Sequence, residues 1–147
     1  VRVDDPEPVP LAPVVTDSWT AVSTGDSVLD IDIPDGVELK ADGDRLRHVF
    51  ENLFGNAIEH NDSPVTVRVG MLSDESELGF FVADDGAGIP VSERQEVFEQ
   101  GYTTSTDGTG FGLPIVKDLV EAHGWTISVG ESQQGGARFE VDTTEQG

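Results

Sequence analysis

The segment Ala83-Asp84-Asp85-Gly86-Ala87-Gly88-Ile89-Pro90 directly follows an apolar run, residues 78–83, that predicts a β-strand. Glycine lets a backbone approach a flat ring or a phosphate closely, and an acid at a strand end can accept a hydrogen bond from an exocyclic amine. The segment therefore favours a nucleotide site at the end of a strand. A glycine-rich turn with a capping aspartate would use the same residues.

A second glycine-rich segment, Gly108-Thr109-Gly110-Phe111-Gly112-Leu113, opens a predicted helix over residues 112–123. Free N–H groups at the start of a helix bind anions, so this junction is suited to phosphate. It is neither the lysine-bearing phosphate loop nor the dinucleotide fingerprint, because it lacks their spacing. A flexible linker is the alternative interpretation.

The strongest predicted helix lies upstream and runs to about residue 59, with Asp42 or Asp44 as its cap. Spacings of three and four place its apolar residues on one broad face: Leu46, Val49, Phe50, Leu53, Phe54, Ala57 and Ile58. Asn52 and Asn56 lie one turn apart at the margin of that face. An amide oxygen suits magnesium, although two solvated amides at a helix edge are the simpler explanation when taken alone.

The remaining pattern predicts one α+β domain, a two-layer sandwich with a mixed sheet and about three helices on one face. Residues 1–10 are acidic and proline-rich and are predicted to be a linker or an edge strand, with the domain over residues 11–147. The other predicted helices cover residues 11–22 and 92–98, and the other predicted strands cover residues 29–33, 37–41, 65–71, 125–129 and 137–141.

Composition narrows the class of protein. The 147 residues contain no cysteine, which excludes a disulfide scaffold and thiolate zinc sites. No apolar run reaches the length of about 20 residues that spans a bilayer, so we expect a cytoplasmic segment without direct membrane contact. The chain starts at Val1 and its single methionine is Met71, which indicates a fragment of a longer protein.

The charge balance is extreme. Twenty-nine acidic residues against eight Lys and Arg give a formal net charge of −21, and the acids are spread along the chain. Such a surface repels phosphate backbones, which argues against a nucleic-acid partner. Dispersed acidity with almost no lysine favours a protein adapted to concentrated salt, as in halophiles.

The order of the three segments (asparagine helix, DxGxGIP after a strand, then GTGFGL entering a helix) resembles the ATP-binding catalytic domain of sensor histidine kinases. That domain shares its nucleotide fold, the Bergerat fold, with DNA gyrase, a heat-shock chaperone and the mismatch-repair ATPase MutL. The resemblance covers nearly the whole chain, from about Pro8 to Val141. It also includes Gly135-Gly136-Ala137-Arg138-Phe139, which is similar to the last glycine turn before the family's final strand.

The resemblance implies a site for ATP and Mg²⁺. Asn56 would bind the metal, with Asn52 as its catalytic neighbour one turn before it. Asp84 would hold the adenine amine, and Gly86 and Gly88 would shape the pocket for the ring. Residues 99–107 would form a lid over the phosphates. The other implied nucleotide contacts are His60, Ile89, Phe98, Tyr102, Thr103, Thr104, Gly108, Thr109, Gly110, Phe111, Gly112 and Leu113.

Two positions depart from the family pattern. Glu59 stands where the family often has Lys or Arg, which puts one phosphate contact in doubt, although His60 beside it could compensate. Ala137 stands where related ATPases often have a hydroxyl near the adenine.

Three functions remain open. A kinase would donate the γ-phosphate to a histidine on a separate dimerisation and phosphoacceptor domain, for onward transfer to a response regulator receiver domain. The phosphoacceptor of the family precedes Glu or Asp, and His48, His60 and His123 do not, so this chain alone should not label itself. A hydrolysing ATPase of the gyrase or MutL kind would need a glutamate four residues before Asn56, where Asn52 stands. A non-catalytic nucleotide-binding module is the third possibility. The presence of Asn56, Asp84 and both glycine-rich segments argues against it, and Glu59 keeps it open.

Overall fold

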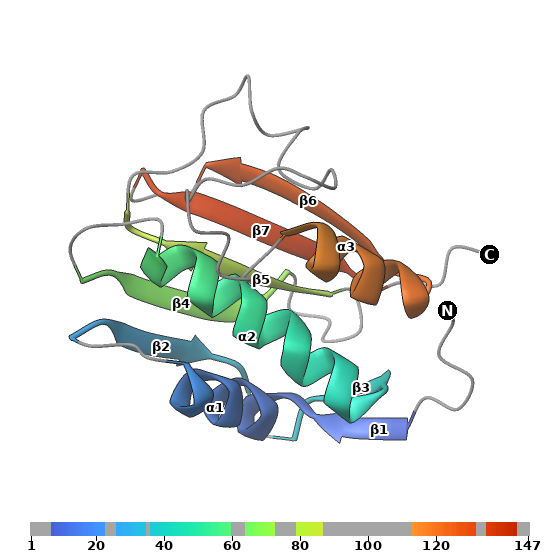
Figure 1. Ribbon diagram of the computed structural model, residues 1–147. Helices are drawn as coiled ribbons and strands as arrows, with labels where there is room; N and C mark the ends of the chain where they lie inside the picture. Colours follow the sequence, from blue (N-terminus) through green and yellow to red (C-terminus); the bar gives the residue numbers. More distant parts are fainter. Residues whose placement is uncertain are drawn as a thin grey trace.

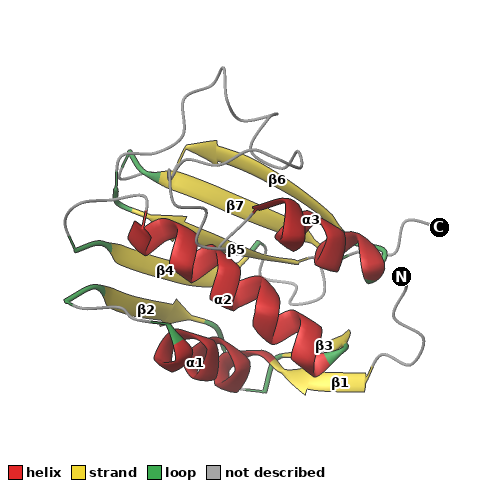
Figure 2. Cartoon of the chain, viewed as in Figure 1, coloured by secondary structure: helices red, strands yellow, loops and turns green. Residues whose placement is uncertain are grey.

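The computed structural model describes residues 7–22, 26–34, 36–59, 64–72, 79–86, 113–131 and 135–143. The described residues form three helices, and Figures 1 and 2 show these helices side by side in front of a twisted sheet. The elements in chain order are β1 (Glu7–Pro10), α1 (Leu11–Ala21), β2 (Val28–Asp32), β3 (Glu38–Ala41), α2 (Gly43–Glu59), β4 (Thr66–Met71), β5 (Gly79–Asp84), α3 (Leu113–Ala122), β6 (Thr126–Glu131) and β7 (Ala137–Asp142).

The sheet is mixed, as the sequence predicts. Its five strands have the order β2-β4-β5-β7-β6, and β2 and β4 run parallel while the other neighbours are antiparallel. The two remaining strands, β1 and β3, form a separate antiparallel ribbon. With the three helices on one face, the described residues confirm the two-layer α+β sandwich (Figure 1).

Residues 7–10, for which the sequence leaves a linker or an edge strand open, form the strand β1. Prolines are compatible with this position because β1 pairs with β3 alone, and an edge strand can leave one row of its backbone groups unpaired. Residues 1–6 and the predicted helix over residues 92–98 lie outside the described residues.

Aromatic packing fixes how α2 sits between α1 and the sheet. Phe50 is fully buried, and its ring lies 5.0 Å from that of Phe80 on β5 and 5.9 Å from that of Phe54. Phe54 in turn meets Trp19 of α1 edge to face at 5.2 Å. Offset and edge-to-face contacts of this kind favour one orientation of the rings. They therefore set the rotation of α2 about its axis, and with it the direction of Asn52 and Asn56.

Capping fixes where α2 begins. The Asp42 carboxylate accepts hydrogen bonds from the amides of Asp44 and Arg45, at 3.1 and 3.3 Å, so Asp42 is the cap rather than Asp44. We expect Asp42→Ala to lower the free energy of unfolding by about 1 kcal/mol in urea denaturation, because two amides at the helix start lose their acceptor. Asp44→Ala is the matched control, and an equal loss there would contradict the assignment of the cap.

The end of α3 has the predicted glycine cap. Gly124 has φ of +79°, and its amide donates to the carbonyl of Glu121 while the amide of Trp125 donates to that of Val120. This pair of bonds is the Schellman motif, which favours glycine because of the positive φ. The motif turns the chain directly from α3 into β6.

Candidate functional site

Asp84 is the last residue of β5 and one of the few polar residues in the described interior, with 7% of its surface exposed. Its Oδ1 accepts a hydrogen bond from the amide of Gly86 at 2.9 Å, which closes an Asx turn over the DxG sequence. The same oxygen accepts a second bond from the amide of Ala137 at 3.2 Å. Two fixed donors hold this carboxylate in one orientation at the end of the strand.

The contact with Ala137 was not predicted from the sequence, because residues 84 and 137 are far apart in the chain. It arises from the sheet register, in which Ala83 on β5 lies opposite Arg138 on β7. The register brings the glycine turn before β7 against the end of β5. The resemblance places both Ala137 and Asp84 near the adenine, and the strand pairing adds the direct contact between the Ala137 amide and the Asp84 carboxylate.

Asn52 and Asn56 occupy the C-terminal half of α2, and both side chains are partly exposed. The Asn52 amide group donates from Nδ2 to the carbonyl of His48 at 2.7 Å, so its orientation is set by its own helix. Among the described residues, no side-chain hydrogen bond holds Asn56.

The only acid adjacent to Asn52 on α2 is already engaged. Glu51 Oε2 lies 2.9 Å from Arg47 Nε, an ion pair between residues one turn apart. Because successive helical residues are about 100° apart around the axis, Glu51 points away from the direction shared by Asn52 and Asn56. This arrangement does not supply the glutamate that a hydrolysing ATPase of the gyrase kind would need.

The two parts of the site lie at one end of the molecule. In Figure 1, the C-terminal end of α2, the end of β5 and the start of β7 all lie at the left of the view. This follows from the topology, since β5 runs antiparallel to both of its neighbours, β4 and β7. Asp84 and the asparagine pair thus belong to the same end of the helix and sheet layers.

Comparisons with known proteins identify the family of the chain. Residues 41–146 match the family described as histidine kinase-, DNA gyrase B- and HSP90-like ATPases. The chain belongs to this family. A sensor histidine kinase of Escherichia coli O157:H7, ZraS, is 37% identical over 102 residues, which are 69% of this chain and 22% of that protein.

Two solved structures show the same fold. The mycobacterial sensor histidine kinase MprB superposes with a TM-score of 0.78 at 26% identity, covering 92% of this chain and 96% of that one. The ATP-binding domain of PrrB from Mycobacterium tuberculosis has a TM-score of 0.69 at 27% identity, with coverage of 95% and 96%. The described fold is that of the ATP-binding catalytic domain of sensor histidine kinases. The chain spans only about a fifth of the length of the ZraS relative. Among the residues that the structure describes, no helix is long and apolar enough to cross a membrane.

Within this kinase-type ATPase domain, the structure describes four of the expected site residues in full: Asn52, Asn56, Asp84 and Gly86. Leu113 begins α3, as the predicted junction of glycine segment and helix requires. The other expected contacts lie outside the described residues: His60, Gly88, Ile89, Phe98, Tyr102, Thr103, Thr104, Gly108, Thr109, Gly110, Phe111 and Gly112. Their roles, and the lid over residues 99–107, stay predictions.

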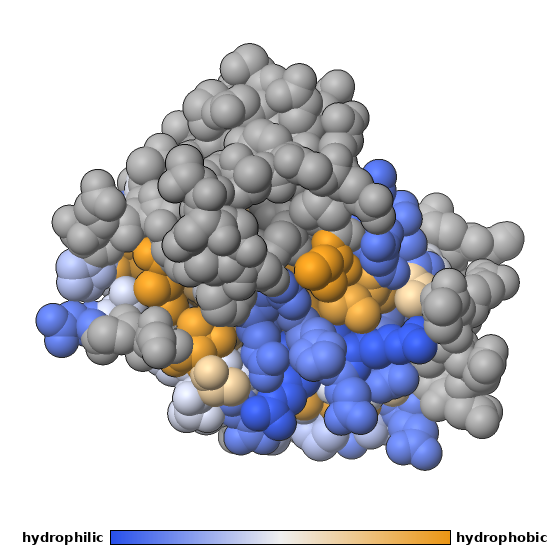
Figure 3. Space-filling model, in the orientation of Figure 1, coloured by the Kyte–Doolittle hydropathy of each residue, from blue (hydrophilic) through white to orange (hydrophobic). Residues whose placement is uncertain are grey.

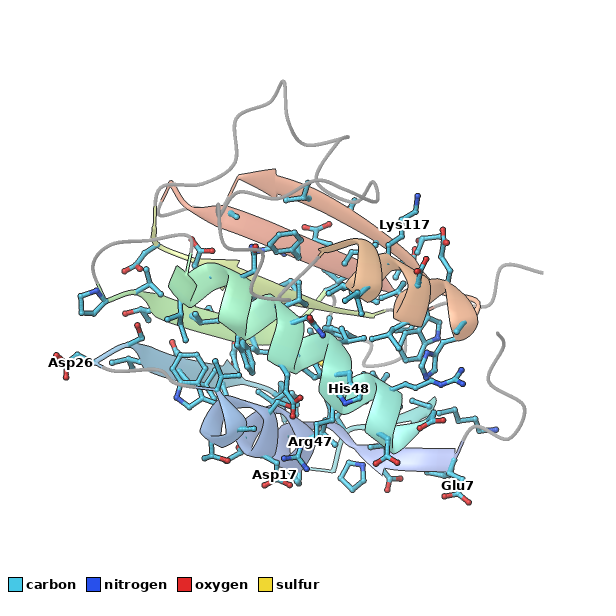
Figure 4. All side chains as sticks on the ribbon, in the orientation of Figure 1. Glu7, Asp17, Asp26, Arg47, His48 and Lys117 are labelled. Atoms are coloured by element: carbon cyan, nitrogen blue, oxygen red, sulfur yellow. The ribbon has the colours of Figure 1, made fainter. Side chains whose placement is uncertain are left out.

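The two described histidines differ sharply. His48 lies on the exposed side of α2, away from the sheet (Figure 4). His123 is partly buried at the end of α3 and stacks on Trp125, with ring centroids 4.3 Å apart. Its Nε2 accepts the amide of Asp42 at 3.1 Å, and its Nδ1 lies 2.8 Å from the carbonyl of Leu119. Only the neutral tautomer with the proton on Nδ1 satisfies both contacts.

Burial lowers the pKa of His123, against smaller raising effects of the Leu119 carbonyl and Asp42, while Arg45 lowers it further. Below a pH of about 6.5, His123 is therefore protonated to a greater extent in the unfolded chain than in the folded chain, and this difference favours unfolding. We therefore expect the melting temperature to fall as the pH is lowered from 7.5 to 5.5, and to fall less in His123→Gln. Equal losses in the two proteins would contradict a neutral His123 in the folded state.

Proposed function

We propose that this chain binds Mg-ATP and presents the γ-phosphate to a histidine on a separate helical domain of the same kinase. The observation that supports this most directly is the buried Asp84 carboxylate, held by the amides of Gly86 and Ala137 at the end of β5. A carboxylate fixed by backbone donors is a preorganised acceptor for an exocyclic amine. Adenine carries such an amine and guanine does not carry it at the same position.

The residues of α2 fit a magnesium ion bound together with the phosphates. Magnesium usually takes only one or two protein oxygens and keeps waters and phosphate oxygens as its other ligands. Asn56 offers one such oxygen, and among the described residues no group of three or more His, Asp or Glu residues could hold a metal by itself. A site of this composition would bind the metal with ATP rather than alone.

The division of labour follows from what phosphoryl transfer requires. Positioning and neutralisation of charge provide most of the catalysis, and bound magnesium would supply positive charge at the phosphate oxygens. Asp84 would bind the adenine. Asn52 and Asn56 would position the magnesium and the phosphates, because they lie one turn apart on α2, which Phe50 and Phe54 hold in place. The acceptor histidine is itself the nucleophile, so this domain needs no catalytic base.

Two partners follow for the full-length kinase: its own dimerisation and phosphoacceptor domain, and a response regulator receiver domain that takes the phosphate onward. Asparagine at position 52, and the pairing of the neighbouring Glu51 with Arg47, support this function over ATP hydrolysis, because no acid takes the position of Asn52. A cytoplasmic location would suit both partners.

The test uses radiolabelled ATP and two samples, the chain alone and the full-length protein that contains it. We expect no acid-labile label on the chain alone and label on the phosphoacceptor domain of the full-length protein. Asn56→Ala should abolish most of that label and weaken ATP binding in magnesium, but not in EDTA. Label on the chain alone, or steady phosphate release without any phosphoprotein, would contradict the proposal.

A further inference from the structure

Gly136 lies closer to Asp84 than any side chain would allow. A Cβ atom at Gly136 would overlap both the carbonyl oxygen of Asp84 and its Oδ1. Real Cβ atoms do not approach oxygen so closely, so a substitution here must displace Asp84 or the turn. The next residue along, Ala137, donates its amide to the same Oδ1 at 3.2 Å.

These two contacts act together on one oxygen. The missing side chain at Gly136 lets the turn before β7 press against the end of β5, and this approach brings the Ala137 amide within reach of the carboxylate. The Gly86 amide donates a hydrogen bond to the same Oδ1 through the Asx turn at the end of β5. The orientation of Asp84 is therefore set jointly by the loop after β5 and by a turn more than fifty residues later.

We propose that the Gly136-Ala137 turn is the positioning element of the nucleotide site, selecting for the 6-amino group of adenine by fixing the Asp84 carboxylate. The inference rests on the proposed function, in which Asp84 binds that amine. Gly136 itself would touch no nucleotide. A substitution at Gly136 should therefore weaken the binding of a nucleotide that carries the 6-amino group and leave the binding of one without it nearly unchanged. A purely structural role would weaken both to the same extent.

The experiment compares ATP with purine riboside triphosphate, which lacks only the 6-amino group, by calorimetry in magnesium. The wild-type chain should bind ATP about ten- to more than a hundred-fold more tightly, as expected for a hydrogen bond to a charged group. In Gly136→Ala, the ratio of the affinity for ATP to that for purine riboside triphosphate should fall most of the way to one. The cause would be weaker ATP binding, while the affinity for purine riboside triphosphate should change by no more than about twofold. The matched control is Gly130→Ala on β6, where an added Cβ meets nothing within 4 Å; it should keep the wild-type ratio.

The outcomes separate the two hypotheses. A wild-type chain that does not distinguish the two nucleotides would overturn the role of Asp84 in the proposed function. A wild-type chain that does distinguish them, together with a folded Gly136→Ala variant that keeps the full ratio, would overturn only the positioning role.

A second measurement applies if Gly136→Ala does not fold. Hydrogen exchange of the Ala137 amide should accelerate at least tenfold in Asp84→Ala, with the Val141 amide of the same strand as the internal reference. Equal changes at Ala137 and Val141 would show that the amide is not held by Asp84 and would overturn the proposal.

Discussion

An Asp84→Asn variant is expected to bind ATP about ten- to more than a hundred-fold more weakly than the wild-type chain, a loss of about 1.5–3 kcal/mol. Asparagine keeps the shape of the side chain, and its amide oxygen can still accept the bonds that Gly86 and Ala137 donate to Oδ1. The second carboxylate oxygen becomes an NH₂ group, which would face the adenine amine as donor against donor. Titration calorimetry in magnesium measures the loss.

Asp85→Asn is the matched control for this experiment. Asp85 has the same side chain one residue further on, is exposed, and accepts the amide of Thr66 at 2.8 Å rather than lying in the interior. Its replacement removes the same charge at nearly the same place, so any general electrostatic effect on ATP appears in both variants. Equal affinities in Asp84→Asn and Asp85→Asn would rule out Asp84 as the adenine contact.

The sequence predicts this fold well because its periodic patterns are strong and local. The apolar face of α2 was expected from spacings of three and four, and Leu46, Val49, Phe50, Leu53 and Phe54 are all buried. The glycine cap of Gly124 was likewise predicted from one residue type at a helix end. The strand at residues 7–10 was harder to assign, because its prolines and acids are typical of a linker and its pairing with β3 is a long-range property.

The site was predictable only in part. Asn52, Asn56 and Asp84 are proposed from the sequence because each belongs to a short motif with its own chemistry, and their roles stay predictions. The contacts of Asp84 with the Gly136-Ala137 turn, and of His123 with the amide of Asp42, join residues 53 and 81 positions apart. Such contacts follow from strand order and helix packing, which spacing within one segment does not encode.

Salt is expected to stabilise this domain strongly, because its charge is large and poorly balanced. The formal net charge is −21, and all four arginines that the structure describes already pair with an acid: Arg45, Arg47, Arg68 and Arg138. Figure 3 shows hydrophilic residues over the part of the helical face where the N-terminal half of α2 lies. The remaining acids therefore repel one another, more in the compact state than in the expanded chain.

Raising sodium chloride from 0.1 to 2 M should increase the melting temperature by roughly 10 °C or more, equal to about 3–5 kcal/mol for a domain of this size. The screening length falls from about 10 Å at 0.1 M to about 3 Å at 1 M, which is shorter than most distances between surface charges. Chloride is the appropriate salt, because sulfate stabilises most proteins by exclusion from their surface.

A triple variant tests whether repulsion is the cause. Asp17, Asp32 and Asp118 are exposed and form no ion pair with another described residue, so changing all three to Asn moves the net charge from −21 to −18 without breaking a described pair. Asp30 is unsuitable because it pairs with Arg68. Since repulsion grows with the square of the net charge, the variant should melt higher than the wild type at 0.1 M chloride and approach it at 2 M. A wild-type melting temperature that stays level across this range would refute adaptation to concentrated salt, while the assignment to the histidine kinase-type ATPase family would be unaffected.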